Sequence, residues 1–368
     1  MSDSILIATR KGLFVLERSA SGWKIARTAF LGDKLSLAVA DPRDGSWYVA
    51  ADLGHFGAKI HRSEDQGRSW SEIGVPEYPP QPEGEPSIDP WGKPLPWKLV
   101  AIWALQPGHP SQPGTIWCGT IPGGLFKSTD YGKTWELNRP LWDHPRRKNW
   151  FGGGADLPGI HSICIHPDDP NELVLAVSCG GVWATRDGGA SWEIRGQGLR
   201  AEFMPPEKQF ELDIQDAHLM VACPAAPEKM WIQHHNGIFR SVDRGMTFEE
   251  IKSLGASTFG LPVAVHPRHG DTAWFVPAVK DECRIPVEGK VSVTRTKDGG
   301  KTADVLTRGL PQEHAYDLVY RHALAVDRTG DRLAFGSTTG SAWTTENGGE
   351  EWKLVSTHLP PIYSVAFA

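Results

Sequence analysis

The chain carries the stretch Ser128-Thr-Asp-Tyr-Gly-Lys-Thr-Trp135, and five variants of this phrase recur along its 368 residues. An Asp or Asn in such a turn accepts hydrogen bonds from backbone N–H groups just ahead of it, and the Gly two positions later adopts a positive φ without a Cβ clash. The hydroxyl residue and the aromatic residue that follow begin a return strand. The phrase therefore predicts the tip of a β-hairpin. The other copies begin at Ser63, Thr185, Ser241, Thr296 and Thr345.

The spacing of the phrase predicts the architecture. Its Asp or Asn falls at positions 65, 130, 187, 243, 298 and 347, so that successive copies are 65, 57, 56, 55 and 49 residues apart. Repeats of this length are typical of β-propeller blades, each of which is a sheet of four antiparallel strands, A to D from the inside outward. We expect the phrase to join strand C to strand D. In the last blade, for example, residues 318–326 are expected to form strand A.

The two ends of the chain supply the remaining blade. Residues 5–8, 12–17 and 23–26 are expected to be strands B, C and D of a blade that lacks its first strand, and residues 362–368 are expected to be that strand. Closure removes the free sheet edges. The sequence therefore predicts an all-β, seven-bladed β-propeller, a single domain whose C-terminal strand closes the N-terminal blade. The expected blades span 4–27 with 362–368, 35–73, 98–138, 159–196, 213–251, 259–307 and 316–355.

The repeated turn resembles the Asp-box, or BNR repeat, found in sialidases and other β-propellers. The chain is most similar to bacterial proteins described as BNR-repeat or exo-α-sialidase-like. Sialidases have six blades and an Arg-Ile-Pro motif near the N-terminus, whereas Arg284-Ile-Pro286 lies in blade 6 of a predicted seven. The catalytic residues of sialidases are therefore not transferred to this chain, and the resemblance implies the fold together with a glycosidase-like hydrolase as a candidate activity.

Composition narrows the class of protein. The net charge of −6 argues against general nucleic-acid binding, and no apolar stretch approaches the ~20 residues of a membrane-spanning helix. The N-terminus lacks the basic and apolar segments of a secretory signal. The five cysteines are odd in number and scattered, which favours free thiols in a reducing cytoplasm. We therefore expect a cytoplasmic protein.

The lengths of the loops indicate which face carries function. In a propeller, the D–A loops between blades and the B–C loops within them emerge on one face. The long insertions are all of these two kinds, and long loops on a rigid scaffold commonly carry the functional residues. We expect the site at the mouth of the central channel on this face. The insertions cover residues 74–97, 139–158, 196–211 and 278–290.

Polar residues of the same loops and of the inner strands are the candidate site residues. Two carboxyl groups placed about 5 to 9.5 Å apart would serve a glycosidase, and a His, Tyr and Arg set would serve a lyase acting on acidic sugars. His234 and His235 are adjacent on a strand end, so only one of them should face the channel. The catalytic candidates are Asp216, Asp281, His161, His234 and Tyr316. The substrate-binding candidates are Arg10, His55, His235, Glu282, Arg284, Arg321 and His322.

Two alternatives remain open at this point. Neutral histidines with Asp216 or Asp281 could hold a divalent metal, but their spacing is not diagnostic, and no metal ligand or cofactor is assigned. The expected ligand is a small molecule or an oligosaccharide, whereas the alternative is a non-catalytic scaffold that binds a partner protein. A deep channel mouth lined by His, Asp and Arg would favour the small ligand. Tryptophans in the insertions would either bind sugar faces or anchor the loops; they are Trp91, Trp97, Trp142 and Trp150.

Overall fold

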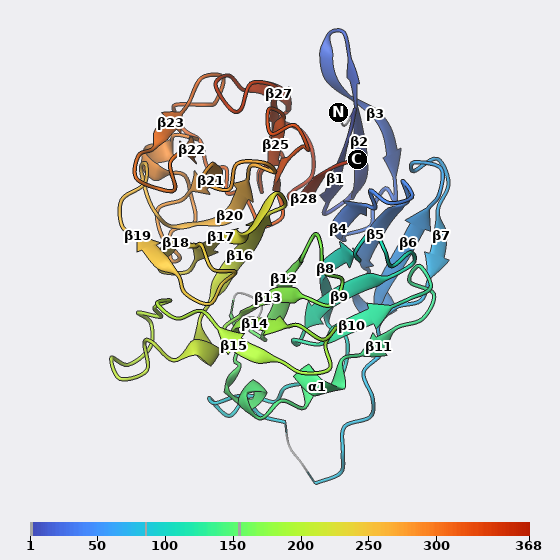
Figure 1. Cartoon of the computed structure of the whole chain (residues 1–368). Helices are drawn as coiled ribbons and strands as arrows, with labels where there is room; N and C mark the ends of the chain where they lie inside the picture. The colour runs from blue at the N-terminus through green and yellow to red at the C-terminus, as the bar shows by residue number, and fades with distance from the viewer. Residues whose placement is uncertain (1–2, 85–86, 154–155) are drawn as a thin grey trace.

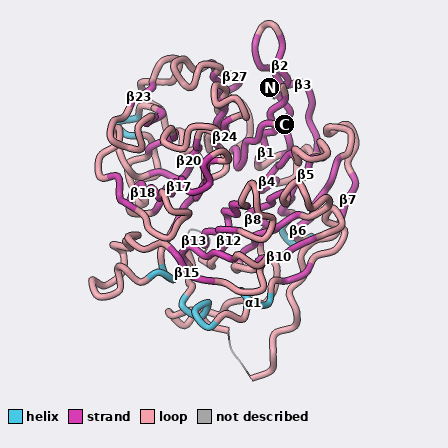
Figure 2. The backbone as a smooth tube through the Cα atoms, in the orientation of Figure 1, coloured by secondary structure: helices cyan, strands magenta, loops and turns pink. Residues whose placement is uncertain are grey.

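The computed structural model describes residues 3–84, 87–153 and 156–368, and this part of the chain forms seven four-stranded antiparallel sheets. The sheets surround a central channel as the blades of a propeller (Figure 1). Figure 2 shows that strands and loops account for nearly all of the backbone, while the helices are short. The seven-bladed fold predicted from the phrase and its spacing is therefore confirmed.

Each sheet runs from an inner to an outer strand in chain order, apart from the blade that contains both ends. Blade 1 consists of β28 (Ile362–Phe367), β1 (Ser4–Thr9), β2 (Gly12–Ser19) and β3 (Gly22–Ala29). Blade 2 consists of β4 (Leu35–Ala40), β5 (Trp47–Asp52), β6 (Ala58–Ser63) and β7 (Ser71–Ile73). Blade 3 consists of β8 (Ala101–Pro107), β9 (Ile116–Ile121), β10 (Leu125–Ser128) and β11 (Glu136–Leu137). Blade 4 consists of β12 (Gly159–Ile165), β13 (Leu173–Ser178), β14 (Gly181–Thr185) and β15 (Glu193–Arg195).

The remaining three blades follow the same order. Blade 5 consists of β16 (Ala217–Cys223), β17 (Ala226–His234), β18 (Gly237–Ser241) and β19 (Glu249–Ile251). Blade 6 consists of β20 (Gly260–Val265), β21 (Ala273–Pro277), β22 (Val293–Thr296) and β23 (Asp304–Leu306). Blade 7 consists of β24 (Leu324–Val326), β25 (Leu333–Gly336), β26 (Ala342–Thr345) and β27 (Lys353–Ser356). The helices are short segments of the connections: η1 (Gly54–Phe56), α1 (Arg139–Trp142), η2 (Pro145–Asn149), η3 (Leu212–Ile214) and η4 (Val287–Gly289).

The C-terminal strand closes the ring, as the sequence predicts. β28 pairs antiparallel with β1, with Val365 opposite Ile7, and the N–H of Ala368 donates to the carbonyl oxygen of Ser4 at 3.0 Å. The two ends of the described chain accordingly lie side by side in Figure 1. Closure therefore depends on hydrogen bonds between residues that are more than 350 positions apart.

The repeated phrase forms the turns that the sequence predicts. In blade 4, Ser191 donates from its backbone N–H to Oδ1 of Asp187 at 2.9 Å and from its hydroxyl to Oδ2 at 2.6 Å. Gly189 has φ +96°, and its N–H donates to Thr185 Oγ1 at 2.9 Å. The hydrogen bonds from Ser191 and Thr185 lower the pKa of Asp187 to about 2. The turn of blade 4 is thus organised around an ionised carboxylate.

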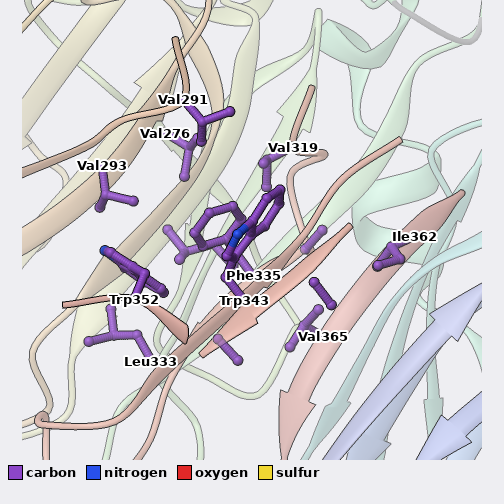
Figure 3. Close-up of a cluster of buried hydrophobic side chains, with 14 of the residues drawn as sticks. Val276, Val291, Val293, Val319, Leu333, Phe335, Trp343, Trp352, Ile362 and Val365 are labelled. Carbon is purple, nitrogen blue, oxygen red and sulfur yellow. The ribbon is translucent and has the colours of Figure 1, made fainter. Parts of the chain in front are cut away.

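Most of the aromatic residues of the phrase pack between blades. Trp192 donates from Nε1 to Oδ1 of Asn138, in the connection from the preceding blade, at 2.9 Å. Figure 3 shows the cluster that contains Trp352 of blade 7 together with Val276 and Val293 of blade 6. Within blade 7, the Trp352 ring lies 4.8 Å from that of Phe335 between centroids. Large aromatic residues at the hairpins therefore fill the space between neighbouring sheets.

One strand prediction is wrong. Residues 318–326 were expected to form a continuous inner strand of blade 7, but β24 covers only Leu324–Val326. The preceding residues form a turn, in which the N–H of Ala323 donates to the carbonyl oxygen of Tyr320 at 3.0 Å. The side chains of Arg321 and His322 hydrogen-bond to other blades instead. None of the helices in the described ranges has the length and hydropathy required to cross a bilayer.

Candidate functional site

A cavity of about 650 Å³ occupies the end of the channel where the D–A and B–C connections emerge. Three of the four long insertions line it: residues 139–158 through Phe151, residues 196–211 through Phe203 and residues 278–290 through Asp281. The fourth insertion reaches the same region, since the Trp91 ring lies 5.9 Å from that of Phe151. The long loops therefore converge at one mouth, and that mouth encloses a cavity large enough for a small ligand.

A repeated irregularity of the inner strands directs side chains into the channel. In β4, β8, β12, β16 and β28 the pairing with the next strand shifts near the start of the strand, so that one residue has no partner across the ladder. In β20 the shift leaves Leu261 and Pro262 without one. Bulges of this kind re-aim a side chain and are common beside active sites. We call these positions the bulge ring: Ser36, Trp103, His161, His218, Leu261 and Tyr363. All of them except His161 line the cavity.

Blade 7 contributes a partition across the channel. Arg321 donates from Nε to the carbonyl oxygen of His218 in blade 5 at 2.7 Å, and His322 Nε2 lies 3.0 Å from the carbonyl oxygen of His161 in blade 4. Arg321 and His322 line both the 650 Å³ cavity and a second one of about 1040 Å³ beyond it. The two residues therefore separate the channel into two compartments.

Asp216 lies at the centre of the cavity's polar residues. Its Oδ1 accepts hydrogen bonds from the hydroxyl of Ser178 at 2.8 Å and from the backbone N–H of Cys179 at 3.2 Å. Burial favours the neutral acid, but the contact with His235 and the interactions with His218 and Arg321 outweigh it and hold the pKa of Asp216 below its usual range. Asp216 is therefore an ionised carboxylate whose Oδ2 faces two histidines.

His218 is oriented by its own hydrogen bond. Its Nδ1 lies 2.7 Å from the carbonyl oxygen of Gly260, so Nδ1 carries the proton and donates it. Nε2 then presents its lone pair, and it lies 3.8 Å from Asp216 Oδ2. Burial and the charge of Arg321 outweigh the attraction of Asp216 and lower the pKa of His218 to about 4. His218 is thus a neutral imidazole at physiological pH.

His235 completes this cluster from the turn after β17. Its Nδ1 lies 3.5 Å from Asp216 Oδ2, and its ring contacts those of Phe203 and His218 at centroid distances of 5.1 and 5.5 Å. Burial lowers the pKa of His235, but the contact with Asp216 outweighs it and leaves the pKa raised. We call Asp216, His218 and His235 the Asp–His–His centre.

Two ion pairs flank the centre within the cavity. Arg284 donates to Oδ1 of Asp281 from Nε at 3.0 Å and from its terminal nitrogen at 2.5 Å. Lys34 Nζ lies 2.5 Å from Asp52 Oδ2 in blade 2. All four residues line the cavity, so its wall carries both signs of charge.

The structure brings together half of the candidate residues. Six of them line the cavity: Asp216, Asp281, His235, Arg284, Arg321 and His322. Arg10, His55, Glu282 and Tyr316 are exposed and do not line it. Topology placed these four near the correct face, but their side chains lie outside the mouth.

Two histidines named as catalytic candidates lie elsewhere. His234 is fully buried beside Phe239 and accepts a hydrogen bond from the N–H of Asn236 at Nδ1, because consecutive residues at a strand end point in opposite directions. His161 lines the second compartment, on the far side of the partition. Neither side chain reaches the Asp–His–His centre.

Several lining residues were not among the candidates. Trp103, Tyr363 and His218 are bulge-ring residues, and Cys179 follows β13. The spacing of Asp216 and His218 was the one available signal, because residues two apart on a strand share a face. The bulges themselves have no common residue type, so the sequence pattern does not reveal them.

Of the four tryptophans in the insertions, three anchor the loops and one is exposed on the surface. Trp142 and Trp150 are buried, and the Trp97 ring lies 5.2 Å from that of Trp142, so these three anchor the insertions. Trp91 is exposed and remains available for a ligand. The five cysteines are all free thiols, in keeping with the sequence analysis.

Comparison with known proteins agrees with this architecture. Residues 125–137 match the family model described as the BNR-Asp box repeat. The sialidase of Bacteroides fragilis is 25% identical over 158 residues, which cover 38% of this chain and 29% of the sialidase. This chain is a seven-bladed β-propeller that carries the BNR-Asp box repeat.

Another relative of this chain is named a xyloglucanase. The xyloglucanase Xgh74A of Acetivibrio thermocellus is 24% identical over 264 residues, which cover 63% of this chain and 29% of the xyloglucanase. The chain therefore spans less than a third of that relative's length.

Solved structures are similar in fold. An ancestral GH74 enzyme has a TM-score of 0.57 at 17% identity, covering 87% of this chain and 38% of that enzyme. YCF48 bound to D1 peptide has a TM-score of 0.55 at 12% identity, covering 90% and 85% of the two chains. At these identities the similarity concerns the propeller itself.

Proposed function

We propose that the BNR-repeat propeller is an enzyme that binds an acidic carbohydrate in the 650 Å³ cavity and cleaves it by hydrolysis or elimination. The observation that carries this proposal is the meeting, in one cavity, of two arginines, the Asp–His–His centre and a set of aromatic walls. Cavities of this size with a few convergent polar groups are the usual form of a small-molecule site.

The arginines supply the binding site for the acidic group. Arg321 uses Nε for the carbonyl oxygen of His218, and within the described ranges its two terminal nitrogens donate no hydrogen bond to the protein. Its guanidinium lies 4.5 Å from the centroid of the Trp103 ring, which fixes its plane. A carboxylate would accept two parallel hydrogen bonds from such a fork. Arg284, although paired with Asp281, adds positive charge at the same mouth.

The aromatic residues supply walls for a sugar ring. Tyr320 and Tyr363 are stacked with centroids 5.7 Å apart and an angle of 16° between the rings, and both line the cavity with Trp103. Flat apolar surfaces beside charged groups suit a ligand that has an apolar face and a carboxylate. The combination supports an acidic sugar in preference to a simple anion.

The chemical roles follow from the charge states. Asp216 is ionised, so it accepts protons or orients a partner and does not serve as the general acid of a glycosidase pair. Asp281, the second member of the expected pair, is engaged by Arg284. We therefore assign the reacting centre to Asp216 with His218 and His235, and substrate binding to the arginines.

The comparisons support the substrate class at a coarse level. Carbohydrate-acting enzymes occur among the relatives, through a xyloglucanase and a sialidase. The peptide-bound YCF48 represents the alternative of a protein-binding scaffold. The open cavity favours the enzyme, because a scaffold would not require ionised groups at the base of a channel mouth.

Turnover of a panel of oligosaccharides tests the proposal. The panel contains uronic-acid oligomers and neutral glucans, and the products are resolved by mass spectrometry. We expect cleavage of an acidic member and a loss of at least ~100-fold in kcat for Asp216→Asn, since the reacting centre loses its charge. His55→Ala, on the same face but outside the cavity, should retain full activity. Full activity of Asp216→Asn, or cleavage of neutral members alone, would contradict the proposal.

A further inference from the structure

We propose that Asp216, His218 and His235 bind one divalent transition-metal ion at the base of the cavity. One ligand atom from each residue lies within 4.8 Å of the other two. This inference deepens the proposed function, on which its place in an active site rests, but the binding of the metal itself can be measured without any substrate.

The distances suit a single ion. Asp216 Oδ2 lies 3.8 Å from His218 Nε2 and 3.5 Å from His235 Nδ1. Bonds of about 2.0–2.1 Å to a tetrahedral ion place ligand atoms roughly 3.3 Å apart. Asp216 Oδ2 therefore lies within about 0.5 Å of the required separation from each nitrogen. The two nitrogens, which lie within 4.8 Å of one another, would approach by rotation of the histidine side chains.

The unpartnered nitrogen of His218 points to a cation. Because Nδ1 donates to Gly260, Nε2 directs a lone pair toward the carboxylate oxygen Oδ2 of Asp216. Within the described ranges Nε2 has no hydrogen-bond donor, and the side chain is only 4% exposed. Two electron-rich atoms facing each other in a buried site repel one another unless a positive ion lies between them.

The surrounding hydrogen bonds have the form found around metal ligands. A ligating histidine normally donates its other N–H to a carbonyl or carboxylate, and His218 does so to Gly260. A ligating carboxylate is normally held by its second oxygen, and Asp216 Oδ1 is held by Ser178 and Cys179. These partners hold Oδ2 and Nε2 toward the shared space before any ion binds.

The ligand set indicates the class of metal. Two imidazoles and one carboxylate suit zinc, iron(II), cobalt(II) or manganese(II) in preference to calcium or magnesium, which favour all-oxygen sites. Three protein ligands leave further positions open, as in catalytic sites, and these positions face the cavity. The neighbouring Arg321 would repel a bare cation, so a substrate carboxylate on Arg321 would also favour the metal.

Cobalt(II) provides a direct test on the intact chain. Protein freed of metal by a chelator is titrated with Co²⁺ while the visible d–d absorption is recorded, and Zn²⁺, Mg²⁺ and Ca²⁺ are compared by calorimetry. We expect one equivalent of Co²⁺ to give bands typical of a nitrogen- and oxygen-ligated ion, Zn²⁺ to displace it, and neither Mg²⁺ nor Ca²⁺ to do so. Absence of stoichiometric Co²⁺ or Zn²⁺ binding would overturn the proposal.

Variants distinguish this site from adventitious binding. Asp216→Asn and His218→Gln keep similar shapes, and each should weaken Co²⁺ binding by at least about 100-fold. The control variant His55→Ala removes an exposed histidine outside the cavity and should bind as the wild type does. Thermal unfolding in the absence of metal checks that each variant is folded. Unchanged affinity in both folded centre variants would assign the metal to another place and overturn the proposal.

The two proposals fail separately. If the metal binds as described but no acidic carbohydrate is cleaved, the metal site stands and the substrate assignment is wrong. If an acidic carbohydrate is cleaved at the same rate after chelation and metal analysis finds no ion, the cavity remains the active site and the metal proposal is wrong.

Discussion

Arg321 of blade 7 spans the channel and donates from Nε to the carbonyl oxygen of His218 in blade 5 at 2.7 Å. The residue that orients the guanidinium of Arg321 is therefore also a member of the Asp–His–His centre. Any movement of β16 changes both the position of His218 and the direction of the guanidinium.

Arg321→Lys should weaken the binding of a uronic-acid ligand by roughly 10-fold, because an ammonium group keeps the charge but lacks the planar fork that binds a carboxylate through two hydrogen bonds. Calorimetry with a uronate and with its methyl ester separates the two contributions. The ester, which lacks the anion, should bind the variant and the wild type equally. Equal loss for both ligands would show that the substitution disturbs the cavity and that the fork has no special role.

His322→Ala should lower the free energy of unfolding by about 1 kcal/mol, the usual value for a hydrogen bond to a backbone carbonyl, since His161 loses its partner across the channel. It should also connect the two compartments, because His322 lines both. Urea unfolding measures the first effect, and a crystal structure of the variant shows the second. An unchanged midpoint would mean that the partition contributes nothing to stability.

Ile362→Ala should destabilise the ring by about 2–4 kcal/mol, because the Ile362 side chain is fully buried in the strand that closes blade 1. The matched control is Leu354→Ala on β27, where the side chain is 54% exposed and little apolar surface is lost. Denaturant unfolding compares the two variants. Equal effects would indicate that closure by β28 is not a major source of stability.

The ionised carboxylate of Asp187 predicts that the stability of the fold decreases in acid. The pKa of Asp187 is about 2 in the folded chain and 3.8 ordinarily, so its contribution to stability is complete above pH ~4 and is lost as the pH falls toward 2. Asp187→Asn keeps an acceptor for the backbone but has no charge, as Asn347 does in the sixth copy. The Tm of the wild type should exceed that of the variant at pH 6 and equal it near pH 2. A difference in Tm that is independent of pH would contradict this prediction.

The sequence predicted the scaffold better than the site for a physical reason. The turn phrase depends on local hydrogen bonds, such as those of Asp187, which the sequence displays directly. The site depends on bulges and on a strand that ends early. Residues 318–326 are mostly apolar, as expected for an inner strand, yet β24 begins only at Leu324, and the side chains of Arg321 and His322 hydrogen-bond to other blades.

The direction of individual side chains was predictable only where a local rule applied. Adjacent residues at a strand end point apart, and His234 and His235 do so, with His235 in the cavity and His234 in the core. His218 and Trp103 occupy bulges, and a bulge leaves no mark in the residue types beside it. Tyr316 and Arg10 are exposed and do not line the cavity. The strand topology predicts on which face of the propeller a residue lies, but it does not predict whether its side chain reaches the channel.

The bulge ring separates the requirements of folding from those of chemistry. A residue without a partner across the ladder can be substituted while the paired residues on either side keep the sheet intact. The inner strands of six of the seven blades contain such a position. Ser36, Leu261 and Tyr363 are such positions, and they line the same cavity as the Asp–His–His centre. Substitutions at these positions would therefore change the lining of the cavity without changing the strand pairing of the propeller.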